Sequence, residues 1–358
     1  MKKKLLAVTL LGLLSASLLP GAAALAAEAP TVIRFGMATV GKGGVPYAPD
    51  NTSELAHQRQ TIEEELKADG IKVEWHYFKG AGPAVNEALA NKQLDFSMQG
   101  DLPAVVGKAG GLNTKLIAAD RLLNSTYLVV PADSPARSLA DLQGKKVSLF
   151  KGTNLHLVIL RALKREGFRD RDFRLVNMDT ATASAALASK DIDGGWFGPE
   201  AFQFQDKGIG RIIYDSRAVD ASLTRQAHVL VDGDFEQKHP EIVQKVANGL
   251  VKAAAWAAAD ANREEALKLW ANSGTPVEAL RQVQAGQSFL RNYSPRIDAF
   301  FIERYRTTVK ESKELGLIRN DVDVAQWVEP KYVERAIEQA GLQALWPVYD
   351  ADNRVGSR

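Results

Sequence analysis

The stretch KVSLFKGTNLHLVILRALKRE, residues 146–166, combines the two patterns that decide the fold class. Its first part, Lys146–Phe150, predicts a short strand, and Leu155–Glu166 repeats apolar residues at helical spacing. Between them, Lys151–Asn154 contains one glycine and predicts a tight loop. The stretch therefore predicts a strand, a small polar loop and an amphipathic helix, the unit from which α/β folds are built.

The same layout occurs earlier in the chain. Leu94–Met98 predicts a strand that leads through Gly100 and Asp101 into a helix, and the glycine loop Gly41–Gly44 follows the predicted strand Thr31–Thr39. Glycine lets a backbone approach a ligand closely, and the first N–H groups of a helix attract anions. The loops are therefore candidate sites for a small oxyanion, although glycine turns also enter helices for purely structural reasons.

Length and composition favour a globular protein of two domains. The chain has 358 residues, of which 46% are hydrophobic and 25% charged. With 45 basic and 43 acidic residues the net charge is +2, too balanced for a dedicated nucleic-acid binder. The cysteine count of 0 excludes disulfides and thiolate metal sites.

The N-terminus has the pattern of a signal peptide. Three lysines precede the apolar run Leu5–Leu19, and the small residues Ala24–Ala26 follow it. The alternative, a membrane anchor, would need about 20 apolar residues, and Pro20 ends this run earlier. We expect residues 1–26 to be removed near Ala26, leaving a soluble periplasmic protein.

Alternating strands and helices predict two α/β modules, near residues 31–128 and 130–228. From Glu236 onward long helices dominate, and Gly/Pro punctuation separates them. The expected helices are Ile242–Ala259, Arg263–Trp270, Val277–Leu290, Ile297–Leu315 and Tyr332–Ala340. No tandem repeat with a period of 20–50 residues is visible.

Searches for catalytic and metal patterns find nothing specific. The sequence contains neither a G-x-S-x-G elbow nor a G-x-x-x-x-G-K-[ST] phosphate loop. No two of its five histidines have the spacing of a helical metal site. We therefore expect no catalytic residue, no metal and no cofactor, and single out only His156, which lies in the first turn after the Lys151–Asn154 loop.

Three stretches together carry a family resemblance: FKGAGP at 78–83, LDFSMQGDLPA at 94–104, and SLADLQGKKV at 138–147 leading into Lys151-Gly152-Thr153. They resemble the periplasmic solute-binding proteins of ABC importers for aliphatic sulfonates, taurine and nitrate. The sulfonate branch is the most similar.

The resemblance implies an α/β fold of the type II periplasmic-binding-protein class. Two lobes are joined by two crossover strands, here near Leu128–Pro131 and Ala227–Val231, with the ligand in the cleft between them. Lobe 1 would comprise 27–128 and 230–358, lobe 2 would comprise 129–229, and the C-terminal helices would pack on lobe 1.

The resemblance also implies ligand-binding residues. In lobe 1 they are Gly41, Lys42, Gly100 and Asp101; in lobe 2 they are Gly152, Thr153, Asn154, His156 and Phe197; and Arg225 precedes the second crossover. Where sulfonate-binding members have a Trp-Asp-Pro run, this chain has Phe197-Gly198-Pro199. Arg225 could supply a fork-shaped donor to an anion or lie on the surface. We expect Asp101 to accept backbone N–H bonds as a helix N-cap.

The function implied is capture of an alkyl sulfonate or sulfate ester and its delivery to a membrane permease. A receptor for nitrate, bicarbonate or another small anion is the alternative within that class. The absence of cysteine and the export signal argue against a relative of the thiamine-pathway pyrimidine synthases, and no output domain remains for a sensor. We expect a monomer that binds a small organic anion and no nucleic acid.

Overall fold

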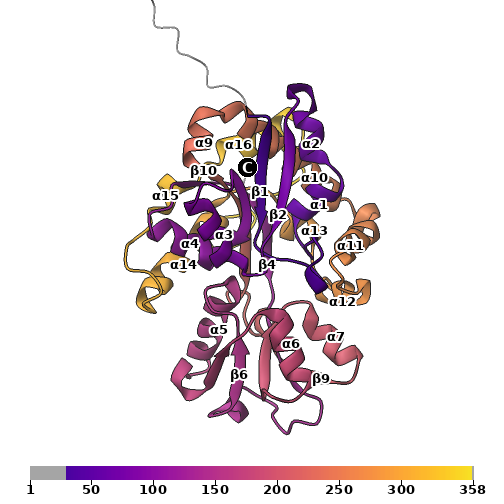
Figure 1. Cartoon of the computed structure of the whole chain (residues 1–358), viewed down its shortest axis with the longest axis vertical. Coiled ribbons are helices and arrows are strands. Elements are labelled where there is room, and N and C mark those ends of the chain that lie inside the picture. Colours follow the sequence, from indigo (N-terminus) through magenta and orange to yellow (C-terminus); the bar gives the residue numbers. More distant parts are fainter. Residues whose placement is uncertain (1–29, 357–358) are drawn as a thin grey trace, which may run out of the picture.

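A computed structural model describes residues 30–356, so the expected signal peptide, 1–26, lies outside the described residues. The chain forms two parts, one above the other in Figure 1, each built on a five-stranded sheet. We call the part that carries β1–β4 and β10 lobe 1, and the part that carries β5–β9 lobe 2. Along residues 30–356, none of the helices combines the length and apolarity that crossing a membrane requires.

The two sheets have equivalent strand orders. Lobe 1 has the order β2-β1-β3-β10-β4, and lobe 2 has the order β7-β6-β8-β5-β9. In each sheet four strands run in one direction, and the fourth strand in the order runs antiparallel to both its neighbours. The strands of lobe 1 are β1 Val32–Met37, β2 Lys72–Tyr77, β3 Phe96–Gly100, β4 Thr114–Asn124 and β10 Arg225–Asp232. Those of lobe 2 are β5 Tyr127–Pro131, β6 Lys146–Leu149, β7 Arg174–Asn177, β8 Gly194–Phe197 and β9 Gly210–Asp215.

The chain passes between the sheets twice. The first passage is Ser125–Thr126, between β4 and β5, and the second is Asp220–Thr224, between the short helix α8 (Ser216–Val219) and β10. The crossovers expected near Leu128–Pro131 and Ala227–Val231 were placed a few residues too late, because both stretches already pair within a sheet. Two α/β lobes and two passages nevertheless confirm the predicted fold.

Helices cover both sheets. Those of lobe 2 are α5 Asn154–Arg165, α6 Thr180–Ala188, α7 Glu200–Asp206 and α8 Ser216–Val219. Those that precede the passages in lobe 1 are α1 Thr52–Gln58, α2 Thr61–Leu66, α3 Ala81–Ala90 and α4 Asp101–Ala109. The C-terminal helices are α9 Gly233–Lys238, α10 Pro240–Ala258, α11 Arg263–Ala271, α12 Val277–Val283, α13 Phe289–Asn292, α14 Ala299–Glu314, α15 Val324–Trp327 and α16 Lys331–Gln339.

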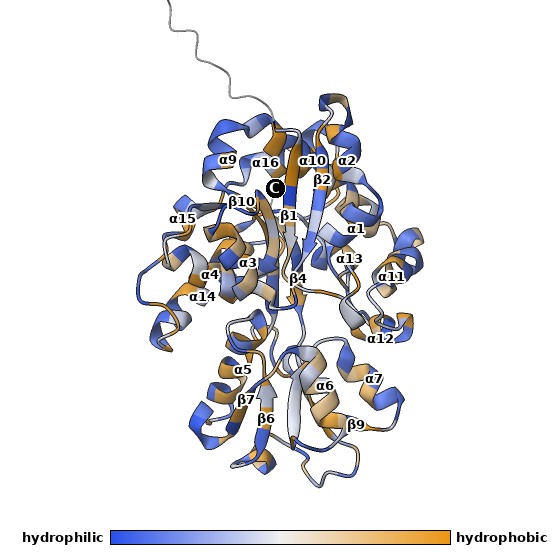
Figure 2. Cartoon of the chain, viewed as in Figure 1, coloured by the Kyte–Doolittle hydropathy of each residue, from blue (hydrophilic) through white to orange (hydrophobic). Residues whose placement is uncertain are grey.

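The C-terminal helices complete the core of lobe 1, as predicted. The helix α10 packs on α1, α2 and α16, and its apolar face joins the strands in one continuous cluster. Lobe 2 has two smaller cores, because its sheet is covered on both faces. In Figure 2, hydrophobic colours follow strands such as β1 and β10, while hydrophilic colours predominate on outer helices such as α9.

Left-handed residues interrupt two helical stretches of the structure. Residues 52–66 divide into α1 and α2 at Gln60, which has a left-handed φ of 55°. The expected helix Val277–Leu290 ends at Val283 and resumes as α13, with Gly286 at φ 67° between the two parts. Left-handed backbone cannot continue an α-helix, so each break redirects the chain.

Candidate ligand site between the lobes

Two of the predicted glycine loops meet where the lobes face each other. Gly100 ends β3 of lobe 1, and Asn154 begins α5 of lobe 2. A Cβ atom placed on Gly100 would lie 2.5 Å from Cβ of Asn154. Only glycine permits this approach. The glycine predicted from the sequence to lie in a ligand loop therefore serves a contact between the lobes.

The loop before α5 is fastened by its own polar groups. Gly152 has a left-handed φ of 77°, and the hydroxyl of Thr153 donates to the carbonyl of Phe150 at 2.7 Å. The N–H of Gly152 donates to Nδ1 of His156 at 3.4 Å. Burial, followed by the charge of Lys151, lowers the pKa of His156, so its ring is neutral at pH 7. The side chains of Thr153 and His156 therefore hold this loop in place through hydrogen bonds.

Asp101 holds the neighbouring loop to the start of β10. The carboxylate is buried, and it accepts N–H bonds from Leu102 at 2.8 Å and from Gln226 at 3.3 Å. Burial raises the pKa of Asp101, and the charge of Arg161 opposes that rise. The expected acceptance of backbone N–H groups is confirmed, but the N-cap of α4 is Gly100 and Asp101 is the first helical residue.

Arg225 is buried at the same junction. Its Nη2 donates to the carbonyl of Ser125 at 2.7 Å, and its Nη1 lies 3.5 Å from Oδ1 of Asn154. Its Nε is buried without a hydrogen-bond partner, and the guanidinium forms no ion pair with any of residues 30–356. Burial lowers the pKa of Arg225, and the charges of Glu200 and Asp101 oppose that shift. A buried cation with a free N–H donor is a group that an anion would satisfy.

Gly198 lies beside this guanidinium. A Cβ atom on Gly198 would be 3.6 Å from Nη2 of Arg225 and 3.4 Å from Oε2 of Glu200. In the resemblance described above, Gly198 takes the place of the Asp in the Trp-Asp-Pro run. Both Cβ distances are ordinary van der Waals distances, so Gly198 leaves only a small gap beside the guanidinium.

Three predicted residues lie apart from this junction. Gly41 and Lys42 pack against the loop after α11, where the N–H of Lys42 donates to the carbonyl of Ser273 at 2.7 Å. The side chain of Phe197 is 1% exposed and packs on Phe204 inside lobe 2, with ring centroids 4.9 Å apart. Phe197 was predicted to bind the ligand, but its side chain lies in the core of lobe 2.

A buried polar cluster near the first passage was not predicted. Asp50 accepts a hydrogen bond from Nε of Arg121 at 3.1 Å and another from the hydroxyl of Tyr293, and all three residues are buried. The sequence did contain a signal for this cluster: Arg121 interrupts the apolar pattern of β4, and a charge in such a strand needs a partner. The partners come from distant segments, which is why the sequence did not name them.

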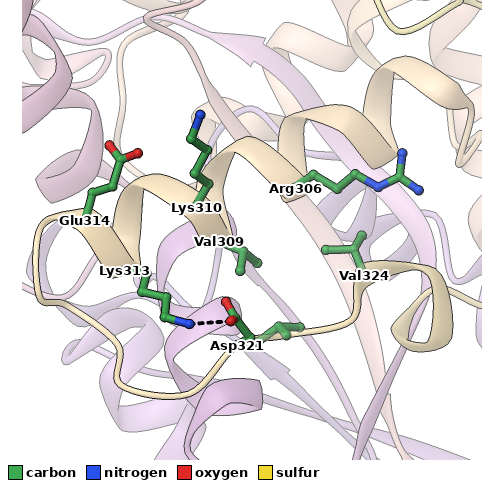
Figure 3. A pocket seen from close by; sticks show the side chains of 8 residues that line it. Arg306, Val309, Lys310, Lys313, Glu314, Asp321 and Val324 are labelled. Carbon is green, nitrogen blue, oxygen red and sulfur yellow. Dashed lines mark hydrogen bonds and ion pairs between the residues drawn. The ribbon is translucent and has the colours of Figure 1, made fainter.

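A surface depression lies elsewhere. It has a volume of about 410 Å³ and is formed by α14, the residues just before α15 and Val324 at the start of α15 (Figure 3). Its lining mixes valines with charged residues, among which Lys313 pairs with Asp321. None of the predicted site residues lines it. In the described range, no His, Asp and Glu side chains form a group of three that could hold a metal ion.

The architecture and the junction define a class of protein, a two-lobed α/β fold with a buried cation where the lobes meet. Comparison with known proteins supports this two-lobed fold. The model of the NMT1/THI5-like family matches residues 66–266, more than half of the chain, and the chain belongs to that family.

One relative and two solved structures illustrate the likeness. A Bacillus subtilis (strain 168) protein named as aliphatic sulfonates-binding is 23% identical over 290 residues, 80% of this chain and 84% of the relative. The periplasmic sulfonate-binding protein SsuA of Methylobacillus flagellatus KT is 30% identical with a TM-score of 0.76, over 89% of this chain and 97% of its own. The desulfurization enzyme DszB, 17% identical, shares the fold with a TM-score of 0.66 over 87% of this chain and 100% of its own.

Proposed function

We propose that this protein is the periplasmic receptor of an ABC importer, and that it captures an organosulfur anion, an aliphatic sulfonate or a sulfate ester. The observation that carries the proposal is Arg225, a buried guanidinium at the interlobe junction whose Nε has no hydrogen-bond partner among residues 30–356. The 30% identity to a sulfonate-binding protein along almost its whole length favours a sulfonate over nitrate or bicarbonate.

The geometry supports an anion on the Arg225 side of Asn154. Gly100 and Asn154 already touch, so the direct line between them has no room for a sulfonate. Beside them, the Arg225 fork, the side-chain amide of Asn154 and the first N–H groups of α5 can converge on one oxyanion. Exclusion of water by the closed lobes would strengthen each of these hydrogen bonds.

The lobes are assigned from the sheets. We propose that residues 30–124 and 225–356 move as lobe 1 and residues 127–219 as lobe 2, about the passages Ser125–Thr126 and Asp220–Thr224, so that the predicted boundaries at 128/129 and 229/230 shift to these passages. The mature protein, cut near Ala26, would be a monomer that presents its ligand to a membrane permease.

The ligand is expected to leave unchanged. The fold alone does not decide this, since DszB is an enzyme. The relatives named for sulfonate binding and the cysteine count of 0 favour a receptor. Incubation of catalytic amounts of protein with excess sulfonate or sulfate ester should release neither sulfite nor sulfate, and steady release would contradict the receptor role.

A thermal-shift screen tests the ligand class. The purified mature protein is heated with linear alkanesulfonates, alkyl sulfates, nitrate, bicarbonate and inorganic sulfate. Because a ligand that binds only the folded state raises the melting temperature, sulfonates or sulfate esters should give the largest shifts. A larger shift with nitrate or bicarbonate would overturn the proposed ligand class and leave the receptor fold unaffected.

A further inference from the structure

The helix α5 is buried on two faces. One face, which includes Leu155 and Ile159, belongs to the core of lobe 2. The other carries Asn154, Val158 and Arg161, which are four and then three residues apart and so share one side of the helix. Val158 is 0% exposed although it is outside the lobe 2 core clusters, and α5 packs on α4 and β10 of lobe 1. The second face is therefore a seam between the lobes.

Arg161 ends this seam in a partly buried ion pair with lobe 1. Its Nε pairs with Glu311 and its Nη2 donates to the hydroxyl of Thr308 at 3.2 Å, and both partners lie on α14. The side chain of Arg161 is 7% exposed, against 29% for Glu311. Its Nη1 is buried and has no hydrogen-bond partner in the described part of the chain, and its charge acts on Asp101 in the ligand loop. One guanidinium of lobe 2 thus faces two carboxylates of lobe 1.

The same helix of lobe 1 fastens the second passage. Nη2 of Arg304 donates to the carbonyl of Ser222 at 2.7 Å and to that of Thr224 at 3.2 Å. The helix α14 therefore contacts both the lobe that would move and the segment about which it would move. It lies beyond residues 66–266, the part matched by the family model.

We infer that the Arg161–Glu311 pair is a latch that holds the lobes closed on the α14 side, and that Arg161 is a positioning residue for the ligand site. Arg161 lies two turns from Asn154 on the same helix face, so fixing one end of that face fixes the other. Buried ion pairs add little net stability but specify one geometry, and removing one partner strands the other charge. The inference rests on the proposed function, since it presumes lobes that open.

The test measures the interlobe distance without any ligand. The chain has no cysteine, so Glu87→Cys on α3 and Ala185→Cys on α6, both exposed, can carry a spin-label pair across the lobes. We expect one narrow distance distribution for this labelled parent. Arg161→Ala should broaden it toward longer distances, and Glu311→Gln should do so at least as much, because it leaves the more buried charge unpaired.

Lys164→Ala is the matched control. Lys164 pairs with Glu314 between the same two helices at 3.6 Å, but its side chain is 72% exposed. Exposed pairs contribute little, so this variant should keep the parental distribution. Equal distributions for parent, Arg161→Ala and Glu311→Gln, with the folded state confirmed by circular dichroism, would overturn the latch.

A second arm measures affinity for the best sulfonate from the screen. If the lobes of the Arg161→Ala protein are closed for one tenth of the time, the apparent Kd of that variant rises about tenfold. A change in distance without a change in Kd would place the latch outside ligand binding and overturn the positioning role of Arg161. Failure of every anion to bind, with the distance change intact, would contradict the proposed function and leave the latch standing.

Discussion

Gly100 of lobe 1 and Asn154 of lobe 2 touch across the junction. Gly100 has no side chain, and Asn154 is the first residue of the helix α5. The Cβ atom that any other residue would place there would come within 2.5 to 2.7 Å of three atoms of Asn154. Non-bonded atoms do not approach so closely, so the lobes reach this arrangement only with glycine at position 100. The glycine is thus a requirement of closure.

Replacing Gly100 with alanine should prevent full closure and leave each lobe folded. Gly100 has an extended φ of −81°, which alanine adopts without strain, so the melting temperature should change little. Affinity for the best ligand should fall at least tenfold. Calorimetric titration and small-angle scattering check this. Asn154→Gly in the same chain removes the clashing side chain and should restore closure, and a compact Gly100→Ala protein would contradict the account.

Gly152→Val should abolish ligand binding. Gly152 has a φ of 77°, and a Cβ atom there would lie 3.1 Å from Cγ of Pro83 in lobe 1. Gly167→Val is the control, because Gly167 has a φ of 83° and nothing within 4 Å of its added Cβ. Both variants carry the backbone strain of a β-branched residue at positive φ. Only the first should lose binding in a calorimetric titration, and equal losses would show that strain alone is responsible.

His228 should make stability depend on pH. The residue is buried on β10, its Nδ1 is paired with the hydroxyl of Tyr305, and burial lowers its pKa to about 3. Its pKa in the unfolded chain is about 6.5, so the unfolded state binds more protons between these values. As the pH falls below about 6.5, this site should lose up to ~1.4 kcal/mol of unfolding free energy per pH unit.

Urea titrations from pH 7 to pH 4.5 measure that loss. The parent is compared with His228→Gln, which cannot take up the proton, and with His76→Gln, an exposed histidine. The stability advantage of the parent over His228→Gln should shrink as the pH falls, while His76→Gln should follow the parent. Parallel curves for parent and His228→Gln would show that His228 titrates normally.

The N-terminus of the exported protein should be near Ala27. The lysines at 2–4, the apolar run Leu5–Leu19 and Ala24–Ala26 form the pattern on which the expectation rests. N-terminal sequencing of protein from a periplasmic extract checks it. Recovery of intact Met1 on membranes would contradict it.

The local units of the fold could be predicted from the sequence. The segments β3–α4 and β6–α5 are each a strand, a glycine loop and a helix within about 20 residues, so their patterns are complete in one stretch. The signal for Arg225 was its place before a predicted crossover, and the structure brings its guanidinium to Asn154 at the start of α5. The helix expected at 277–290 failed because a left-handed glycine in its middle resembles any other glycine in a sequence.

The long-range contacts could not be predicted. Arg161 meets a residue 150 positions away in Glu311, and Asp50 meets Tyr293 across 243 positions. No periodicity links such pairs, since they depend on how finished lobes pack. Phe197 failed for a related reason: strand alternation places a residue on one face of β8 but does not say which face lies toward the ligand.

Calorimetric titration of the mature protein and its Arg225→Gln variant tests the central claim most directly. The parent should bind a linear sulfonate or alkyl sulfate with one site per chain. Loss of the buried guanidinium should cost about 1.5–3 kcal/mol, a rise in Kd of roughly 10- to 150-fold. The exposed Arg171→Gln should bind like the parent. If Arg225→Gln binds as tightly as the parent, the anion does not rest on Arg225, and the site proposed between the lobes is contradicted.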